Sequence, residues 1–325
     1  MLAMALTSAP KICVIGDVAW DVLIRTTTEL RKGGDTFGLV ELQPGGSAAN
    51  VAVWASRSGA DVTFIGKVGR DRMGELAAEN LHSERVVAFL PDTRDHLTGS
   101  VAVFVDHTGE RSMVSGRGAD FDLMPDELPY EALRTADHLH LTAWSFFTDP
   151  PRGAARRAAE VASQSGATLS FDPGSFQMIE EMGAAEFLRV TADIGVDVFL
   201  PNREEGAALT GLDEPGEIAA ALHDLYRGAL VVLKLDAEGA LVHGAESSFH
   251  VDSVPAQMND ATGAGDSFAG AFLSVYLASG DALGATEFAT HISAWVIGRA
   301  GARPPVDESI RQILEKFSPS SGLTG

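Results

Sequence analysis

The sequence is short of cysteine and of long apolar runs. Its one cysteine, Cys13, lies in the apolar run KICVIG and cannot form an intramolecular disulfide, so we expect a buried thiol and a reducing, cytoplasmic location. The first residues, MLAMALTSAPK, lack a basic region and a long apolar core, and no run of about eighteen apolar residues occurs anywhere. We therefore expect neither export nor a membrane span.

Positive charge is also scarce: 24 Lys and Arg residues stand against 45 Asp and Glu residues, for a formal net charge of −21. This charge disfavours unspecific binding to nucleic acid or to anionic membranes. The 325 residues, 45% of them apolar, suffice for one large α/β domain or two modest ones. We expect a globular protein whose ligands are small molecules.

Short β-like runs alternate with helical segments along most of the chain. Strands are predicted at 11–16, 62–66, 138–142, 168–172, 196–201 and 229–234, and helices at 47–58, from about 73, at 152–165 and after 266. This order predicts β-α-β units and a mainly parallel sheet. Two segments, about 18–42 and 98–115, are β-rich without helices between them, which favours a small antiparallel sheet inserted as a lid. An extended edge of the main sheet is the alternative.

The stretch NDATGAGDSFAGAFL (259–273) places a glycine-rich turn before a helix. The apolar residues after it recur at the spacing of one buried helical face, at Phe268, Ala271, Phe272, Val275 and Tyr276. The unpaired N–H groups of such a helix start favour a phosphate, although a plain turn and cap is the alternative. No P-loop is present, and the dinucleotide fingerprint fails because Phe268 takes the place of its third glycine.

Four sequence elements resemble the ribokinase/PfkB family of carbohydrate kinases. DATGAGDSFAGAF (260–272) is similar to the family's C-terminal signature, and PGGSAANVAVWASRSGADVTFIGKVGRDRMGE (44–75) to its N-terminal signature. PNREE (201–205) resembles its N-x-x-E element and GDVAWD (16–21) its first substrate loop. The resemblance implies a single ribokinase-like α/β domain over 1–325: a three-layer α/β/α fold with a mainly parallel central sheet and a small β-sheet lid.

The same resemblance implies an ATP-dependent kinase that uses Mg²⁺ and phosphorylates a hydroxyl of a small sugar or sugar acid. A nucleoside kinase of the same family, or a catalytically silent sugar- or nucleotide-binding regulator, are the alternatives. The intact Asp266 and N-x-x-E element argue against the regulator. Because family members often dimerise through lid strands, we also expect a homodimer.

By this resemblance Asp266 is the catalytic base, and the N–H groups of Gly263, Ala264 and Gly265 stabilise the charge that develops on the phosphoryl group. A carboxylate at a helix N-terminus is expected to have a lowered pKa. Asn202 and Glu205 would share a helix face and position Mg²⁺-ATP through water. An ordinary helix start with a surface glutamate is the alternative.

The resemblance also implies that the first loop, the N-terminal glycine turn and the end of the lid bind the acceptor. Glycines let the backbone approach the sugar, and carboxylates accept hydrogen bonds from paired hydroxyls. The candidates are Asp17, Asp21, Gly45, Gly46, Asn50 and Arg117. A turn, cap or solvated role is the alternative for the charged ones. His138 and His140 share a strand face, but with no third metal ligand evident we interpret them as structural.

The resemblance also implies a site for a monovalent cation such as K⁺. Asp260 and Thr262 match family positions that hold the ion, and IGRAGARPP (297–305) resembles the loop that supplies further carbonyl oxygens. The sequence departs from many relatives beside Asp260 and at Pro305, so one ligand could be missing. A turn-capping role for Asp260 is the alternative.

Overall fold

The computed structural model describes residues 8–105, 111–116 and 118–317. Its centre is a nine-stranded sheet in the order β15-β14-β13-β12-β11-β10-β1-β4-β6. Seven of these strands run parallel: β1 (Lys11–Ile15), β4 (Asp61–Ile65), β6 (Val87–Phe89), β10 (His138–Thr142), β11 (Thr168–Asp172), β12 (Val198–Phe199) and β13 (Leu230–Lys234). The strands β14 (Ala240–His243) and β15 (Ser248–Val251) extend one edge in antiparallel pairing. The mainly parallel sheet is thus confirmed, although β12 is shorter than the run 196–201.

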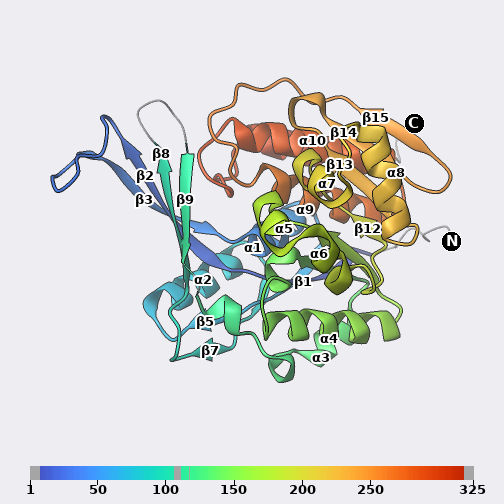
Figure 1. The fold of residues 1–325 in the computed structure, drawn as a ribbon, viewed down its shortest axis with the longest axis horizontal. Helices are drawn as coiled ribbons and strands as arrows, with labels where there is room; N and C mark the ends of the chain where they lie inside the picture. The colour runs from blue at the N-terminus through green and yellow to red at the C-terminus, as the bar shows by residue number, and fades with distance from the viewer. Residues whose placement is uncertain (1–7, 106–110, 117, 318–325) are drawn as a thin grey trace.

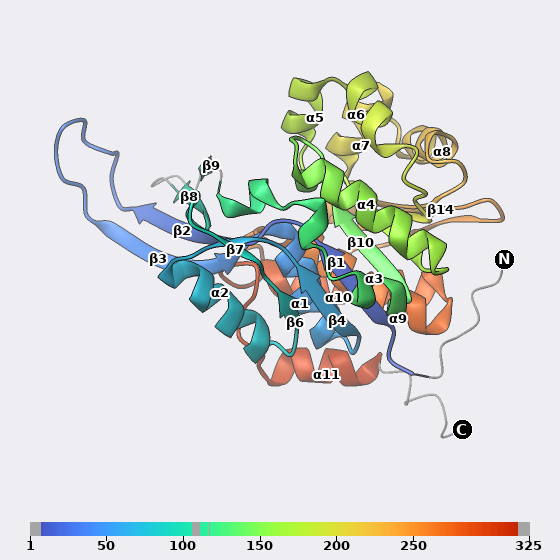
Figure 2. The ribbon, with the colours of Figure 1, turned by 90° about the horizontal axis from the view of Figure 1, so that it is seen from below.

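Helices cover both faces of this sheet, which makes the fold three-layered (Figure 2). One core contains buried residues of α1 (Ser47–Arg57), α2 (Arg72–Ser83), α9 (Ala264–Ser279), α10 (Ala282–Ile297) and α11 (Glu308–Lys316). The other contains those of α3 (Tyr130–Thr135), α4 (Pro151–Gln164), α5 (Phe176–Met182), α6 (Ala184–Thr191), α7 (Arg203–Thr210) and α8 (Pro215–Leu225). Neighbouring residues of β1 divide between the two cores, because side chains alternate along a strand.

A separate four-stranded sheet, here called the lid sheet, projects from the body (Figure 1). It contains β2 (Ala19–Thr26), β3 (Gly38–Gly45), β8 (Gly99–Val105) and β9 (Arg111–Gly116) in the order β3-β2-β8-β9. Its two outer pairs are antiparallel as expected, but β2 and β8 pair in parallel. The pattern of apolar residues predicts that strands exist, not the direction in which distant strands meet. A further short pair joins β5 (Val68–Gly69) to β7 (Asp92–Thr93).

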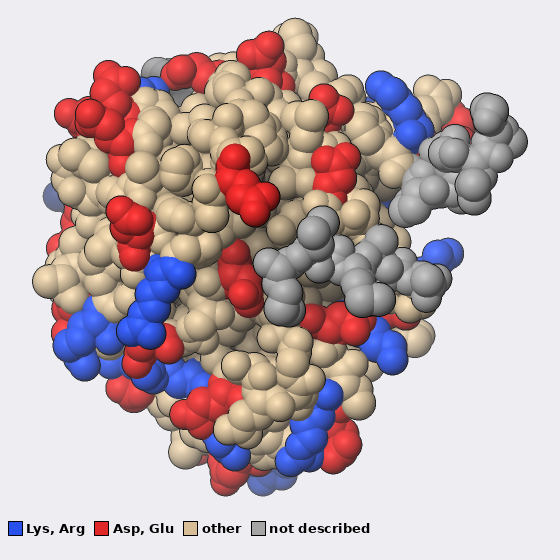
Figure 3. Space-filling model, turned by 90° about the vertical axis from the view of Figure 1, so that its right-hand side faces the viewer, with Lys and Arg blue, Asp and Glu red and all other residues tan. Residues whose placement is uncertain are grey.

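Two other expectations concern the surface and the membrane. The face drawn in Figure 3 carries Asp and Glu side chains across its whole extent, in keeping with the net charge of −21. Within the part of the chain that the structure describes, no helix combines the length and the apolar character needed to cross a bilayer.

Candidate active site

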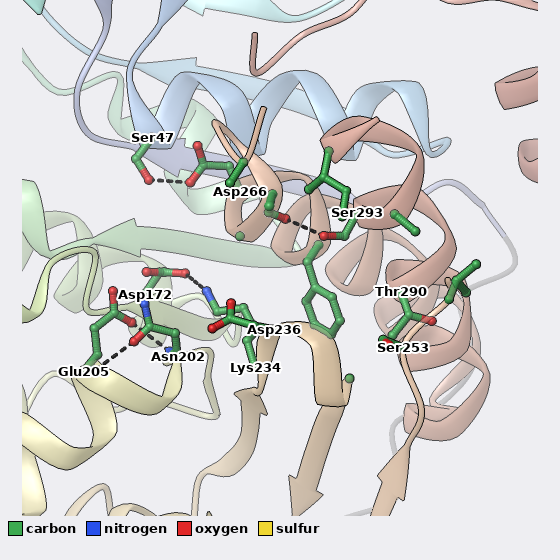
Figure 4. Close-up of a pocket in the computed structure, with 18 of the residues that line it drawn as sticks. Ser47, Asp172, Asn202, Glu205, Lys234, Asp236, Ser253, Asp266, Thr290 and Ser293 are labelled. Atoms are coloured by element: carbon green, nitrogen blue, oxygen red, sulfur yellow. Dashed lines mark hydrogen bonds and ion pairs between the residues drawn. The ribbon is translucent and has the colours of Figure 1, made fainter. Parts of the chain in front are cut away.

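A pocket of about 330 Å³ opens beyond the carboxyl ends of the central strands, where parallel sheets commonly bind ligands. Its polar lining includes the start of α9, the start of α7 and the ends of β11 and β13 (Figure 4). Its charged residues are Asp172, Glu205, Lys234, Asp236 and Asp266. Segments far apart in the sequence therefore meet here, as the order of strands predicts.

The glycine turn at 263–265 forms the start of α9. Gly263 is the N-cap with φ 75° and Ala264 is the first helical residue, so the glycines lie at the helix N-terminus as predicted. A Cβ on Gly263 would lie 2.5 Å from the Cβ of Ala302, so this position has room only for glycine. Ala264, Gly265 and Asp266 line the pocket, but the N–H of Ala264 already donates to the carbonyl of Ala261 at 3.3 Å. The N–H groups of Gly265 and Asp266 are therefore the ones that the first turn offers to an anion there.

Asp266 lies in this first turn with both carboxylate oxygens hydrogen-bonded. Ser47 donates its hydroxyl to Oδ1 at 2.7 Å, and Asn50 donates from Nδ2 to Oδ2 at 2.7 Å. Burial raises the pKa of Asp266 to about 7, because these two hydrogen bonds only partly offset the loss of water. The expected lowering of this pKa is therefore wrong: a helix N-terminus contributes about 2 kcal/mol at most, less than full desolvation of a carboxylate.

Asn202 and Glu205 form a capping box at the start of α7. The Oδ1 of Asn202 accepts the N–H of Glu205 at 2.8 Å, and the Oε2 of Glu205 accepts the N–H of Asn202 at 2.8 Å. Glu205 is 4% exposed and lines the pocket, so the alternative of a surface glutamate is wrong. Burial, followed by the nearby charge of Asp172, raises the pKa of Glu205, while Lys234 opposes the shift.

Lys234 and Asp172 are pocket residues to which the sequence gave no role, although Asp172 was expected at this edge of the sheet as the end of a strand. They end β13 and β11, and the Nζ of Lys234 donates to Oδ2 of Asp172 at 2.8 Å. Burial acts to lower the pKa of Lys234, but the charges of Asp172 and Glu205 outweigh it and raise the value. The ammonium lies 3.3 Å from the place of a Cβ on Gly265, so it borders the glycine turn. A lysine closing the apolar run ALVVLK was the available signal.

Asp17 and the glycines at 45 and 46 pack around the start of α1. The carboxylate of Asp17 accepts hydrogen bonds from the N–H groups of Ser47 and Ala48 at 2.7 and 3.1 Å. Asp17 therefore has the turn or cap role that the sequence left open as the alternative to sugar binding. Gly46 has φ 90°, and a Cβ there would lie 2.6 Å from the carbonyl oxygen of Asp17. Both features therefore shape the turn itself, whatever binds beside it.

Two more carboxylates border Asp17. A Cβ on Gly45 would lie 2.6 Å from the Asp21 carboxylate, and burial raises the pKa of Asp21 to about 6, with Arg303 opposing. Asp120, missed by sequence reasoning, has an Oδ1 that is buried without a hydrogen-bond partner among the described residues. Burial, and then the charge of Asp17, raise its pKa to about 7. Arg117 lies outside the described residues.

Asn50 occupies the expected place beside the base, but its amide is already engaged at both ends. Its Nδ2 donates to Asp266 at 2.7 Å, and its Oδ1 accepts from the Nε of Arg303 at 2.7 Å. The expected direct hydrogen bond from Asn50 to a sugar hydroxyl therefore competes with contacts inside the protein.

The histidines and the cysteine have structural surroundings. His138 bonds the hydroxyls of Thr168 and Ser170 at 2.7 Å, and His140 bonds Ser170 at 2.7 Å. Burial lowers the pKa of both to about 3, so they are neutral. The described residues include no group of three His, Cys, Asp or Glu arranged to hold a metal ion. Cys13 is a buried free thiol, as expected.

Asp260 links the two loops that the cation prediction names. Its Oδ1 accepts the N–H of Thr262 at 2.8 Å, and its Oδ2 accepts the N–H of Gly301 at 3.0 Å. The N–H groups of Asn259 and Asp260 both donate to the carbonyl of Ile297. The loops are therefore adjacent, with a buried carboxylate between them, and the cation itself stays a prediction.

Comparisons with known proteins agree with this geometry. Residues 9–309 match the model of the pfkB family of carbohydrate kinases. The chain is 33% identical to an ATP-dependent ribose-1-phosphate kinase of Halopiger xanaduensis, over 93% of this chain and 97% of that one. A ribokinase II candidate of Escherichia coli in complex with ATP and Mg²⁺ matches with TM-score 0.82 and 24% identity, over 94% and 99% of the two chains. A ribokinase of Arabidopsis thaliana complexed with ribose and ATP matches with TM-score 0.78 and 22% identity, over 95% and 99%. These structural matches confirm the ribokinase-like fold.

Proposed function

The chain belongs to the pfkB family of carbohydrate kinases, and we propose that it transfers the γ-phosphoryl group of ATP to a hydroxyl of a small sugar or sugar acid. As a family member it is a phosphotransferase with a hydroxyl acceptor, of the sugar and nucleoside kinase type. The observation that carries the finer proposal is the buried carboxylate of Asp266 beside the N–H groups that begin α9.

Asp266 is the proton acceptor in this proposal. The acceptor's hydroxyl oxygen bonds to the γ-phosphorus while the bond from that phosphorus to the ADP oxygen breaks, and the hydroxyl proton passes to Asp266. A pKa of about 7 suits this task, because the carboxylate is partly ionised at neutral pH and a stronger base than an exposed aspartate. Ser47 and Asn50 hold the two oxygens in place until the acceptor arrives.

In this proposal, a positive charge and backbone N–H donors would bind the phosphates of ATP from two sides. The first turn of α9 offers backbone N–H groups, and Lys234 offers an ammonium beside the same glycine turn. Asp172, Asn202 and Glu205 present the oxygen ligands that Mg²⁺ prefers, directly or through water. Bound there, Mg²⁺ would neutralise charge on the phosphate oxygens during transfer. The site residues thus fit ATP with its metal.

Among the described residues, several carboxylates lie where the acceptor sugar is expected to bind, beside the start of α1. Asp17, Asp21 and Asp120 cluster there, and each has its pKa raised first of all by burial. Carboxylates accept hydrogen bonds from hydroxyls but repel other anions, which favours an uncharged sugar over a sugar acid. An adenosine kinase of Sinorhizobium meliloti shares the fold at 24% identity, so a nucleoside belongs in the test.

ADP release with a panel of acceptors tests the function. Ribose, fructose, 2-keto-3-deoxygluconate, tagatose 6-phosphate, ribose 1-phosphate and adenosine cover the sugar, acid, phosphorylated and nucleoside classes. We expect turnover with an uncharged sugar. If adenosine is the one acceptor of the panel that is phosphorylated, the proposed substrate class changes from sugar to nucleoside.

Asp266→Asn should lower kcat by roughly 10²–10⁴-fold with little change in sugar affinity. Asp197→Asn is the control, since Asp197 accepts the N–H of Leu169 and is not a pocket residue. Near-normal turnover of Asp266→Asn would remove the assignment of the base.

We further propose that one kinase domain over 1–325 works as a cytoplasmic homodimer paired through the lid sheet. Its outer strands expose large apolar side chains, including Val40 at 66% and Val114 at 63%. Sheet edges with exposed apolar residues are readily paired by another copy. Sedimentation velocity of Val40→Asp should show a shift toward monomer, and a wild-type monomer would refute the dimer. The free thiol of Cys13 supports the reducing location.

A further inference from the structure

Arg303, in the loop that follows α10, touches three parts of the acceptor side with one guanidinium. Its Nε donates to Oδ1 of Asn50 at 2.7 Å, its Nη1 to Oδ1 of Asn80 at 2.8 Å, and its Nη2 to the carbonyl of Gly45 at 2.9 Å. Burial lowers the pKa of Arg303 to about 10, so it is charged at neutral pH. The residue therefore joins α1, α2 and the glycine turn by charged hydrogen bonds.

The contact with Asn50 fixes which way that amide faces. A guanidinium has only donors, so the amide oxygen must face Arg303. The amide nitrogen then faces Asp266, and its 2.7 Å hydrogen bond reaches Oδ2 of the carboxylate. An amide turned the other way would set its N–H donors against the N–H donors of Arg303 and its oxygen against an oxygen of the Asp266 carboxylate. The two hydrogen bonds in series therefore both point toward Asp266: Arg303 donates to Asn50, and Asn50 donates to Asp266.

We propose that Arg303 is a positioning residue for the base of the phosphoryl transfer: through Asn50 it holds the Asp266 carboxylate in place and favours its ionised form. The inference rests on the proposed function of Asp266. Arg303 makes no hydrogen bond to Asp266 itself and acts on it through the amide of Asn50 and through its own positive charge. The same guanidinium holds the Gly45 carbonyl, so the acceptor turn and the base keep a constant separation.

The charges around Asp266 make this role measurable. Asp172 and Asp17 raise the pKa of Asp266, and the charges of Lys234 and Arg303 act in the opposite direction. Loss of Arg303 removes one positive charge and loosens the donor on Oδ2. Both changes favour the protonated carboxyl, so the pKa of Asp266 should rise.

Arg303→Met keeps an unbranched apolar stem but is shorter and removes every donor. We expect kcat to fall about 10- to 100-fold and the acid limb of kcat/KM to move up by at least about half a pH unit, with KM for ATP unchanged. Arg303→Lys, which keeps the charge and one donor position, should recover part of both losses. In an Asn50→Leu background the same Arg303→Met change should lower kcat by less than it does in wild type, since the hydrogen-bonded link is already broken and only the effect of the charge remains.

Arg57→Met is the matched control. Arg57 donates to Glu84 and to the carbonyl of Pro304, in the same loop, but does not touch Asn50. The Arg57→Met variant should have a lower free energy of unfolding than wild type, while its kcat and its pH profile stay at wild-type values. If Arg303→Met behaves like Arg57→Met, with stability lost and the acid limb unmoved, the positioning role is wrong.

Two results separate this inference from the proposed function. If Asp266→Asn keeps turnover, the base itself is wrongly assigned. If Asp266→Asn loses turnover while Arg303→Met is normal, only the positioning role fails.

A titration without any acceptor gives an independent readout. In aspartate-labelled protein, the carboxyl carbon of Asp266, assigned by the Asp266→Asn variant, should titrate at higher pH by NMR in Arg303→Met than in wild type. Equal titration would overturn the inference.

Discussion

Replacement of Gly263 by alanine probes how tightly the phosphate turn is held against the loop behind it. Gly263 has φ 75°, in the left-handed region, and the new Cβ would lie 2.5 Å from the Cβ of Ala302 and 2.6 Å from its Cα. The substitution therefore carries two costs: backbone strain at the turn and a clash with a neighbour that includes main chain. Either could displace the N–H groups that begin α9.

The two costs can be estimated separately. The left-handed conformation costs a non-glycine residue roughly 1–2 kcal/mol. Overpacking of a tight contact adds about 1–3 kcal/mol. To restore ordinary van der Waals contact, which begins at 3.4 Å, the turn must move by about 1 Å. A displacement of about 1 Å at a catalytic turn can lower kcat by about 10²-fold.

Gly166→Ala is the matched control. Gly166 follows α4 with φ 86° and has no atom within 4 Å of its Cβ position, so it carries the strain without the clash. In urea, Gly166→Ala should lose about 1–2 kcal/mol of the free energy of unfolding, with unchanged kcat. Gly263→Ala should lose about 2–5 kcal/mol and most of its turnover. If the two variants match in stability and Gly263→Ala keeps its kcat, the turn is not the anion site that we describe.

Four further outcomes follow from the site. The kcat/KM of wild type should fall about tenfold per pH unit below about 7, where the raised pKa leaves Asp266 protonated, and a flat profile from pH 5 to 8 would contradict this. Glu205→Gln should raise the Mg²⁺ concentration for half-maximal rate, whereas Glu204→Gln on the exposed side of α7 should not. K⁺ added at constant ionic strength to a tetramethylammonium buffer should raise kcat or lower KM, and no change would mean that the site at Asp260 is absent or idle. Acceptor sugar should slow hydrogen exchange in β2, β3 and β8, and equal exchange with and without sugar would count against lid closure.

Short sequence patterns predicted the features that depend on neighbouring residues, such as helix positions, helix ends and the order of strands and helices. The helical spacing after Asp266 predicted the helix α9, and Gly280 ends it in the left-handed conformation. The predicted single buried face is wrong, because α9 is buried on all sides from Ser267 to Ser274, while Val275 and Tyr276 are half-buried. The alternation of strands and helices predicted the parallel sheet and hence the edge at which the pocket lies. The resemblance to known kinases then assigned chemistry to residues that the fold does bring together, Asp266 and Asn50 among them.

Long-range packing decides what the sequence could not show. Ser47 and Asp266 are 219 positions apart, and Arg303 and Asn50 are 253 apart, so no spacing rule connects them. The pKa of Asp266 was predicted in the wrong direction for the same reason. A helix start is visible in the sequence, whereas the burial that overrides its effect comes from distant segments.

Burial of the base also costs stability, and the sign of that cost can be worked out. The pKa of Asp266 rises from 3.8 to about 7 on folding, so between these values the folded state binds more protons than the unfolded state. Stability is then highest below about pH 4 as far as this group is concerned, and it declines as pH rises to about 7. Asp266→Asn removes the ionised group, so it should raise the free energy of unfolding at pH 8 while it removes turnover. The same low-dielectric setting that makes this carboxylate a better base therefore makes it a worse contributor to the fold, which is why Ser47, Asn50 and Arg303 are needed to hold it.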